Sequence, residues 1–284
     1  MPVVQKQAAK PKRKKAAKPK GVLDRIKPIG FDEEEGIKIN LYGKSGTGKT
    51  SLWGTFPDPI LAIICSGGSR PGELRSIDTP ENRGRIKSVV IESSAEISEI
   101  VEYQKDSEEF ATVVLDHASG LQDLKLKEIL EIDELPAQLG WGVAQQQDWG
   151  QCALQTKETL RALLSLKCNV VIVAQERNFN TDGDSESILM PTVGSALTPS
   201  ITGWLNPACD YIAQTFIRNK TKEVVRTVGK KKIPKTVRLE GVDYCLRVGP
   251  DEVYTTKFRV PGGVSEDIIV NPDYSKIINI IQGG

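Results

Sequence analysis

The sequence predicts an α/β protein with a mostly parallel central sheet flanked by helices, and three observations support this class. Apolar runs typical of buried strands alternate with longer polar segments from residue 36 to residue 175, which is the pattern of a parallel sheet with helical crossovers. A glycine-rich segment, GKSGTGKTS, directly follows the first apolar run. From residue 211 to about residue 260, alternating residues predict C-terminal antiparallel hairpins, with GKKKIP at one turn.

Each element is assigned from its own residues. Continuous apolar runs predict strands at residues 36–42, 60–65, 86–92, 110–116 and 168–175. Helices are expected at residues 50–56, 95–104, 121–131 and 144–166, the last of them long and amphipathic. The segment PAQLGWG separates the final two helices, because proline and glycine interrupt regular structure.

Length and composition limit the class of protein. The 284 residues suffice for one large α/β domain or two small ones with a buried core. No apolar run approaches the roughly 18 residues that cross a bilayer, and the N-terminus lacks the apolar segment of a secretory signal. The only histidine, His117, makes a zinc site unexpected. The five cysteines are far apart and are expected to be small core residues in a reducing cytoplasm: Cys65, Cys152, Cys168, Cys209 and Cys245.

The first 20 residues have a composition unlike the rest of the chain. They carry eight Lys/Arg and no acid, which leaves 30 basic and 37 acidic residues elsewhere. We therefore predict a disordered basic arm at residues 1–27 and one folded domain at residues 28–284. Such arms often neutralise nucleic-acid phosphates, although a solubilising tail or a localisation signal would share this composition. The residues of the arm that we expect to contact DNA are Lys12, Arg13, Lys14 and Lys15.

The glycine-rich segment fits the phosphate-binding loop pattern G-x-x-x-x-G-K-[ST]. In this pattern successive backbone N–H groups form a concave nest for phosphate oxygens. Lys49 is expected to reach the β- and γ-phosphates of ATP, and the Thr50 hydroxyl to ligate Mg²⁺. The predicted nucleotide-binding residues are Gly43, Lys44, Ser45, Gly46, Thr47, Gly48, Lys49, Thr50 and Ser51.

A second acidic element follows about seventy residues after the loop. In TVVLDHASG, an apolar strand delivers Asp116 to the carboxyl edge of the sheet, where open α/β folds bind their ligands. At that edge Asp116 can hold the Mg²⁺ shell through water, as the second acid of phosphate-loop enzymes does. The neighbouring His117 is expected to be an ordinary strand-end residue.

The order of these motifs resembles the RecA-type recombinase core, and most closely the small phage RecA-like nucleotide-binding proteins. Besides the phosphate loop and VVLDHASGL, the resemblance includes VIVAQERN, VGSALTPS and a late TKFR, and it covers about residues 38–259. It implies a RecA-like core that uses ATP and Mg²⁺ on single-stranded DNA in recombination, annealing or replication. It also implies a homo-oligomer, ring or filament, in the cytoplasm of a bacterium or phage-infected host, with a single-strand binding protein as a further partner.

The resemblance also suggests roles for residues beyond the phosphate loop. Gln175 stands where that family places a glutamine that senses the γ-phosphate and moves a DNA-binding loop; an ordinary polar strand end is the alternative. The loop at residues 176–193 would then contact DNA through Arg177 and Phe179. Three acids within it oppose this assignment, because they would repel a phosphate backbone: Asp182, Asp184 and Glu186.

The TKFR segment matches the late K-x-[KR] with which RecA-type ATPases reach a neighbouring subunit. By this resemblance, Lys257 and Arg259 would stabilise charge on the neighbour's γ-phosphate during phosphoryl transfer. The alternative is a basic, exposed strand face without this role, which would show the same alternation of Lys257 and Arg259.

One departure concerns the acid that activates water. The resemblance places a catalytic glutamate after the second strand, where this chain has Ser66 and Gly67. Glu73 is the nearest acid, and Glu92 ends the next strand. We expect a DNA-stimulated ATPase in which Glu73, the nearer acid, or Glu92 polarises the water, and slow hydrolysis is the alternative to both. A phosphate-loop kinase of a small substrate and a non-hydrolysing, nucleotide-gated scaffold are the alternatives.

Overall fold

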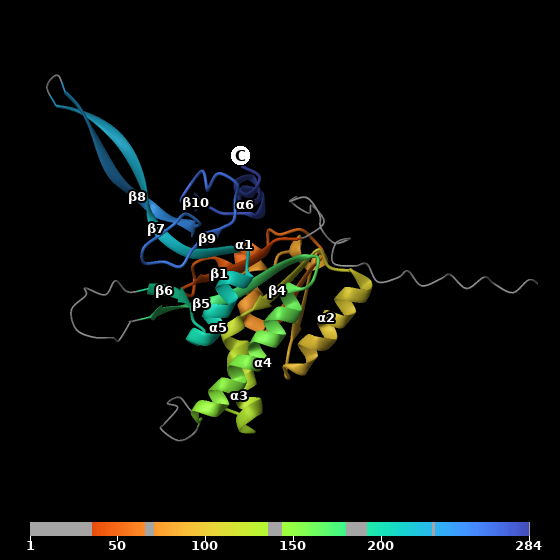
Figure 1. Cartoon of the computed structure of the whole chain (residues 1–284). Coiled ribbons are helices and arrows are strands. Elements are labelled where there is room, and N and C mark those ends of the chain that lie inside the picture. The colour runs from red at the N-terminus through yellow and green to blue at the C-terminus, as the bar shows by residue number, and fades with distance from the viewer. Residues whose placement is uncertain (1–35, 66–70, 136–143, 180–191, 229–230, 284) are drawn as a thin grey trace, which may run out of the picture. The chain divides into compact units, whose positions relative to one another are not determined.

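A sheet of ten strands forms the centre of the part of the chain that this computed structural model describes, namely residues 36–65, 71–135, 144–179, 192–228 and 231–283. Its strand order is β10-β8-β7-β1-β5-β4-β2-β3, with β6 paired to β5 and β9 paired to β7. Figure 1 shows helices packed around this sheet. The predicted α/β class is therefore confirmed, while the predicted arm at residues 1–27 lies outside the described residues.

The first five strands are the predicted apolar runs, with ends that differ from the predicted ones by at most four residues. They are β1 (Lys38–Gly43), β2 (Ile60–Ile64), β3 (Ile86–Val90), β4 (Thr112–Asp116) and β5 (Asn169–Phe179). All pair in parallel with their neighbours, in the order β1-β5-β4-β2-β3. Every residue of β2 and β4 is buried, because helices cover both faces of a parallel sheet.

Helices pack on both faces of the sheet and bury two separate cores. One face is covered by α2 (Ala95–Ser107), α3 (Ala118–Leu130), α4 (Gln146–Leu164) and α5 (Pro199–Ala208). The other face is covered by α1 (Lys49–Trp53), α6 (Tyr274–Ile281) and the 3₁₀ helix η2 (Pro71–Ile77). A second 3₁₀ helix, η3 (Asn82–Gly84), leads into β3. The helices and the sheet therefore form a three-layer α/β/α arrangement.

The predicted C-terminal hairpins correspond to one long hairpin and two short strands. β7 (Tyr211–Val228) pairs in parallel with β1 and antiparallel with β8 (Lys231–Arg247). β9 (Lys257–Phe258) pairs with the start of β7, and β10 (Ile268–Val270) pairs with the end of β8. The structure thus confirms the change from a parallel to an antiparallel sheet after β7.

The predicted DNA-contacting loop at residues 176–193 is the main error in the element assignment. β5 continues to Phe179, and its last four residues pair antiparallel with β6 (Thr192–Ser195). The base of the segment is therefore a two-stranded ribbon. The residues between its strands, 180–191, lie outside the described residues, and so do Asp182, Asp184 and Glu186.

Among the described residues, no helix is both long enough and apolar enough to cross a lipid bilayer.

Gly120 provides a test of the packing between α3 and the end of β2. A Cβ at this position would lie 1.6 Å from the carbonyl oxygen of Cys65, which is backbone and can move only with β2. We expect Gly120→Ala to lower the free energy of unfolding by about 1–3 kcal/mol, measured by urea denaturation.

Gly150 is the matched control, because it lies in α4 and a Cβ added to it would have nothing within 4 Å. Gly150→Ala should stabilise the chain by about 0.5–1 kcal/mol, since alanine restricts the unfolded chain. Equal effects of the two substitutions would contradict the close approach of α3 to β2.

Candidate functional site

The register of three parallel strands brings the predicted nucleotide-binding residues to one edge of the sheet. Gly43, at the end of β1, lies opposite Gln175 of β5 and opposite Thr215 of β7. Asp116 ends β4, which pairs with β5 on the side opposite to β1. The phosphate-loop residues 44–48 begin where β1 ends and lead directly into α1. The loop, Gln175 and Asp116 therefore meet because parallel strands end at a common edge.

The turn from the loop into α1 requires a glycine at position 48. Gly48 has φ +87°, and a Cβ on it would lie 3.0 Å from the Tyr244 ring. The preceding Thr47 is fixed on both sides, because its hydroxyl donates to the Lys44 carbonyl oxygen (2.7 Å) and lies 2.7 Å from the Thr215 hydroxyl. The loop is thus held against β7 and β8.

Lys49 is buried, with 8% of its surface exposed. Its ammonium donates to the carbonyl oxygens of Gly43 (2.7 Å) and Lys44 (2.8 Å) and lies 3.5 Å from Gln175 Oε1. Burial lowers the pKa of Lys49, and the negative charges of Asp116 and Glu176 oppose this shift. The cation lies within the loop and next to the glutamine expected to sense the γ-phosphate.

Asp116 is equally buried, at 6% exposure, and accepts a hydrogen bond of 3.1 Å from the Trp53 indole Nε1. Burial raises the pKa of Asp116, while the Trp53 hydrogen bond and the charges of His117 and Lys49 oppose the shift. His117 follows through a cis peptide bond and caps α3, with Nδ1 accepting from Gly120 N (2.9 Å). His117 is therefore a strand-end residue, as expected.

A cavity of about 710 Å³ joins these groups. Its lining includes residues 45–51 of the loop and α1, together with Asp116, His117 and Gln175. A backbone nest, an ammonium, the Thr50 hydroxyl and a carboxylate on one cavity fit a nucleoside triphosphate with Mg²⁺. The residues present match that ligand, and the described residues contain no separate group of three or more His, Cys, Asp or Glu that could hold a metal.

The cavity also has a wall that the sequence reasoning missed. It consists of residues from α1 and the turn after it, from η2, from β8 and from the segment before α6: Leu52, Thr55, Ser76, Tyr244, Asn271 and Pro272. Asn271 N donates to the Tyr244 carbonyl oxygen (2.7 Å), and Tyr274 N donates to the Thr55 hydroxyl (2.9 Å). No spacing in the sequence relates Tyr244 or Asn271 to the phosphate loop, because both reach it through strand pairing far along the chain.

The candidate water-activating acids belong to different elements. Glu73 belongs to η2, three residues before the cavity-lining Ser76. Glu92 follows β3, the outermost strand beyond β2. Ser66 and Gly67 lie outside the described residues. Of the two acids, only Glu73 is on an element that borders the cavity.

The predicted DNA-contacting residues after Gln175 lie on a strand and not in a loop. Arg177 pairs with Gly194, Phe179 pairs with Thr192, and the Arg177 guanidinium lies 5.5 Å from the Phe179 ring centre. Arg177 is exposed and Phe179 half-buried. The predicted contacts of Lys12, Arg13, Lys14 and Lys15 fall outside the described residues.

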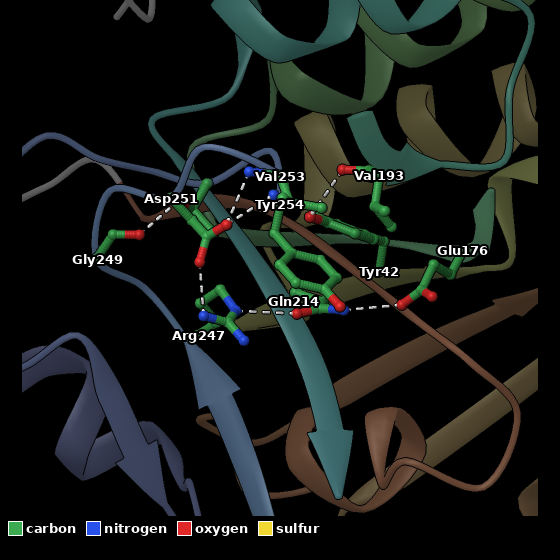
Figure 2. Close-up of polar contacts among 10 residues, drawn as sticks. Tyr42, Glu176, Val193, Gln214, Arg247, Gly249, Asp251, Val253 and Tyr254 are labelled. Atoms are coloured by element: carbon green, nitrogen blue, oxygen red, sulfur yellow. Dashed lines mark hydrogen bonds and ion pairs between the residues drawn. The ribbon is translucent and has the colours of Figure 1, made fainter. Parts of the chain in front are cut away.

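A polar chain joins this ribbon to β7 and β8 (Figure 2). Gln214 Nε2 donates to Glu176 Oε2 (2.9 Å), and Arg247 Nε donates to Gln214 Oε1 (3.1 Å). Arg247 also pairs with Asp251 (2.7 Å), and its guanidinium lies 4.5 Å from the Tyr254 ring centre. The residue after Gln175 is therefore anchored to both strands of the long hairpin.

Lys257 and Arg259 have partners within their own chain. The Lys257 ammonium donates to the carbonyl oxygens of Asn206 (2.8 Å) and Pro207 (3.2 Å), and also to that of Cys209. Arg259 donates to the Pro207 carbonyl oxygen (3.1 Å) and pairs with Asp210 (2.7 Å). In this arrangement the pair caps the carboxyl end of α5, a contact that the sequence did not predict, and the role toward a neighbouring subunit stays a prediction.

The chain has similarity to known proteins at the level of family and fold. The model of a family described as "AAA domain" matches residues 35–260. No curated protein sequence matches the chain. Among solved structures, the flagellar accessory protein FlaH from Methanocaldococcus jannaschii matches with 11% identity and a TM-score of 0.41, covering 84% of this chain and 85% of FlaH.

The buried carboxyl of Asp116 should make stability depend on pH. Because its pKa in the folded chain lies above its ordinary value of 3.8, folding favours the protonated form. That contribution to the free energy of unfolding is complete below about pH 3.8 and is lost as pH rises through the folded pKa. Asp116→Asn, which keeps an acceptor for Trp53, should therefore stabilise the nucleotide-free chain more at about pH 7 than at about pH 4.

Urea denaturation at the two pH values measures this difference. Asp106→Asn, which removes an exposed carboxyl on α2, is the control. A gain for Asp116→Asn that is the same at both pH values would show that desolvation of the carboxylate is not the cause.

Lys257→Met tests the cap on α5, because methionine retains the apolar stem but has no donor. The substitution should lower the free energy of unfolding by about 1–3 kcal/mol, because the carbonyl oxygens at the end of α5 lose their charged donor. Lys105→Met, on the exposed surface of α2, is the control. Normal stability combined with reduced ATP turnover would instead support the neighbouring-subunit role suggested by the RecA resemblance.

Proposed function

Because the chain belongs to the AAA domain family, we propose that it binds ATP with Mg²⁺, hydrolyses it, and couples this cycle to single-stranded DNA in recombination, annealing or replication. The observation that carries the proposal is the meeting of Lys49, Asp116 and Gln175 on one cavity with the phosphate loop. In this site the backbone nest and the Lys49 ammonium bind the β- and γ-phosphates. Thr50 and Asp116 hold Mg²⁺, which neutralises phosphate charge when bound.

Hydrolysis needs a group that receives a proton from the attacking water. The reaction breaks the bond between the γ-phosphorus and the β,γ-bridging oxygen, and forms a bond from the water oxygen to the γ-phosphorus. Gln175 can orient that water or the γ-phosphate, since an amide both donates and accepts. We assign the proton acceptor to Glu73, on the 3₁₀ helix that contributes Ser76 to the cavity.

DNA and a second copy of the chain are the proposed partners. The cluster of Lys12, Arg13, Lys14 and Lys15 supplies charge for phosphate contacts. Arg177, exposed beside Phe179, supplies a cation next to an aromatic ring. Assembly as a ring or filament, and contact with a single-strand binding protein, belong to the same proposal.

A nucleotide-gated scaffold without hydrolysis is the second candidate. One observation favours it: Asp116 is the only acid among the described residues that line the cavity. A kinase of a small substrate has less support, because the described lining includes no arginine.

Release of inorganic phosphate from ATP tests the proposal, measured with and without single-stranded DNA and with candidate small substrates. The parent chain should release phosphate faster when DNA is present. Lys49→Ala should abolish the release and weaken ATP binding while the chain stays folded, because it removes the ammonium from the β- and γ-phosphates. Lys105→Ala, on the exposed surface of α2, is the matched control.

Each other outcome selects a different function. Phosphate release by Lys49→Ala at the parent rate would refute the assignment of the phosphate loop. Tight ATP binding by the parent chain without phosphate release would identify the scaffold, and transfer of the γ-phosphate to a small substrate would identify a kinase.

A further inference from the structure

The strongest unassigned feature is the outer part of β7 and β8, residues 218–228 and 231–238, which we call the basic ribbon. β1 pairs with β7 only as far as Thr215, and β10 pairs only with residues 245–247 of β8. Beyond these points β7 and β8 pair only with each other among the described residues, and Figure 1 shows them continuing past the rest of the sheet. The packing of the core does not require this extension.

The basic ribbon concentrates positive charge in an otherwise acidic domain. Residues 218–238 contain nine Lys/Arg and one acid, Glu223. Outside residues 1–20 and 218–238, the chain has 21 Lys/Arg and 36 Asp/Glu. Lys220 and Lys222 are exposed. A local excess of cations on an acidic domain marks a surface for a polyanion.

Strand register arranges these cations in a regular order. Every second cross-strand pair of the outer ribbon joins one cation to one aliphatic residue, and such alternate positions share a face of a two-stranded ribbon. The pairs are Lys222↔Val237, Val224↔Lys235, Arg226↔Ile233 and Val228↔Lys231. Glu223 pairs with Thr236 and belongs to the other set. One set of positions therefore contains four cations, four aliphatic residues and no acid.

Exposed apolar residues gather on the same hairpin. Of the eight large hydrophobic residues exposed in the described part of the chain, five lie here: Ile217, Val237, Leu239, Val242 and Tyr244. Cations next to exposed apolar and aromatic groups fit nucleic acid, whose phosphates take the charge and whose bases accept apolar contacts. A two-stranded ribbon also has the width of the duplex major groove.

We propose that the basic ribbon is a nucleic-acid-binding element of this protein, with the cations of the Lys222–Val237 set of pairs on the phosphate backbone. The proposal deepens the proposed function, because it names the element that contacts the nucleic acid, and it adds a contact surface to the basic arm and Arg177. Single-stranded and duplex nucleic acid share this chemistry, and the experiment separates them.

The test measures binding of the full chain to a fluorescent single-stranded oligonucleotide, and to a duplex of the same length, over a series of salt concentrations. The ribbon variant replaces four cations with glutamine: Lys222, Arg226, Lys231 and Lys235. The matched control removes four charges outside the ribbon by replacing with glutamine Lys105, Lys127 and Lys157, which are on helices, and Lys167, which follows α4. Phosphate release without nucleic acid is measured on all three proteins, to show that the site near α1 is unchanged.

The ribbon variant should bind more weakly, and its plot of log affinity against log salt should be flatter. Each phosphate contact contributes about 0.7 to that slope for a single strand and about 0.9 for a duplex, so loss of four contacts lowers it by about 3. The control should keep the parent slope. The oligonucleotide, single-stranded or duplex, that loses more affinity in the ribbon variant is the one that the ribbon binds.

Three outcomes would overturn the proposal, and the third of them would give a different reason for the charge of the ribbon. A parent slope in the ribbon variant would exclude the ribbon and leave the proposed function intact. No binding of either oligonucleotide by the parent chain would refute the DNA part of the proposed function as well. Unchanged binding with new self-association in sedimentation velocity would show that the lysines serve only to protect exposed strand edges.

Discussion

The parallel register of β1 between β5 and β7 is the constraint on which the rest of the structure depends. It sets Gly43 level with Gln175 on one side and with Thr215 on the other. The phosphate loop can therefore start only where β5 supplies an amide and β7 supplies a hydroxyl for Thr47. A shift of one residue in β5 would turn Gln175 to the opposite face, and a shift in β7 would turn Thr215 away from Thr47, so either shift would separate the groups of the site.

The site is held together at a cost to the folded chain. Lys49 and Asp116 are both nearly inaccessible to solvent. Burial lowers the pKa of Lys49 and raises the pKa of Asp116, so in each case it favours the uncharged form. Backbone carbonyl oxygens and the Trp53 indole offset part of this penalty. Bound phosphates and Mg²⁺ would provide stronger partners of opposite charge. The nucleotide-free site thus holds charges whose best partners belong to the ligand, as is common for binding sites that trade stability for function.

The parts of this arrangement that follow local rules were predictable from the sequence. Apolar runs indicated the positions of β1 to β5, and the loop spacing identified residues 43–51. The apolar run that ends at Asp116 placed this carboxylate at the same edge of the sheet as the loop, because parallel strands end together. The ribbon made by β5 and β6 was missed, since antiparallel pairing across residues 180–191 leaves no local periodic signal. The cap formed by Lys257 was missed for a similar reason: alternating cations on a strand do not reveal that carbonyl oxygens of α5 lie beside them. Tyr244 was missed because only the pairing of distant strands places it over Gly48.

The position of Tyr244 has a consequence for how two ligands communicate. Its ring packs against Gly48 of the phosphate loop, while its backbone belongs to the strand that continues into the basic ribbon. Suppose that a ligand on the ribbon moves this ring and thereby changes the affinity of the phosphate loop for nucleotide by some factor. Thermodynamic reciprocity then requires nucleotide to change the affinity of the ribbon for its ligand by the same factor. Through this one aromatic side chain, each ligand would then raise or lower the affinity for the other by the same factor, whichever binds first.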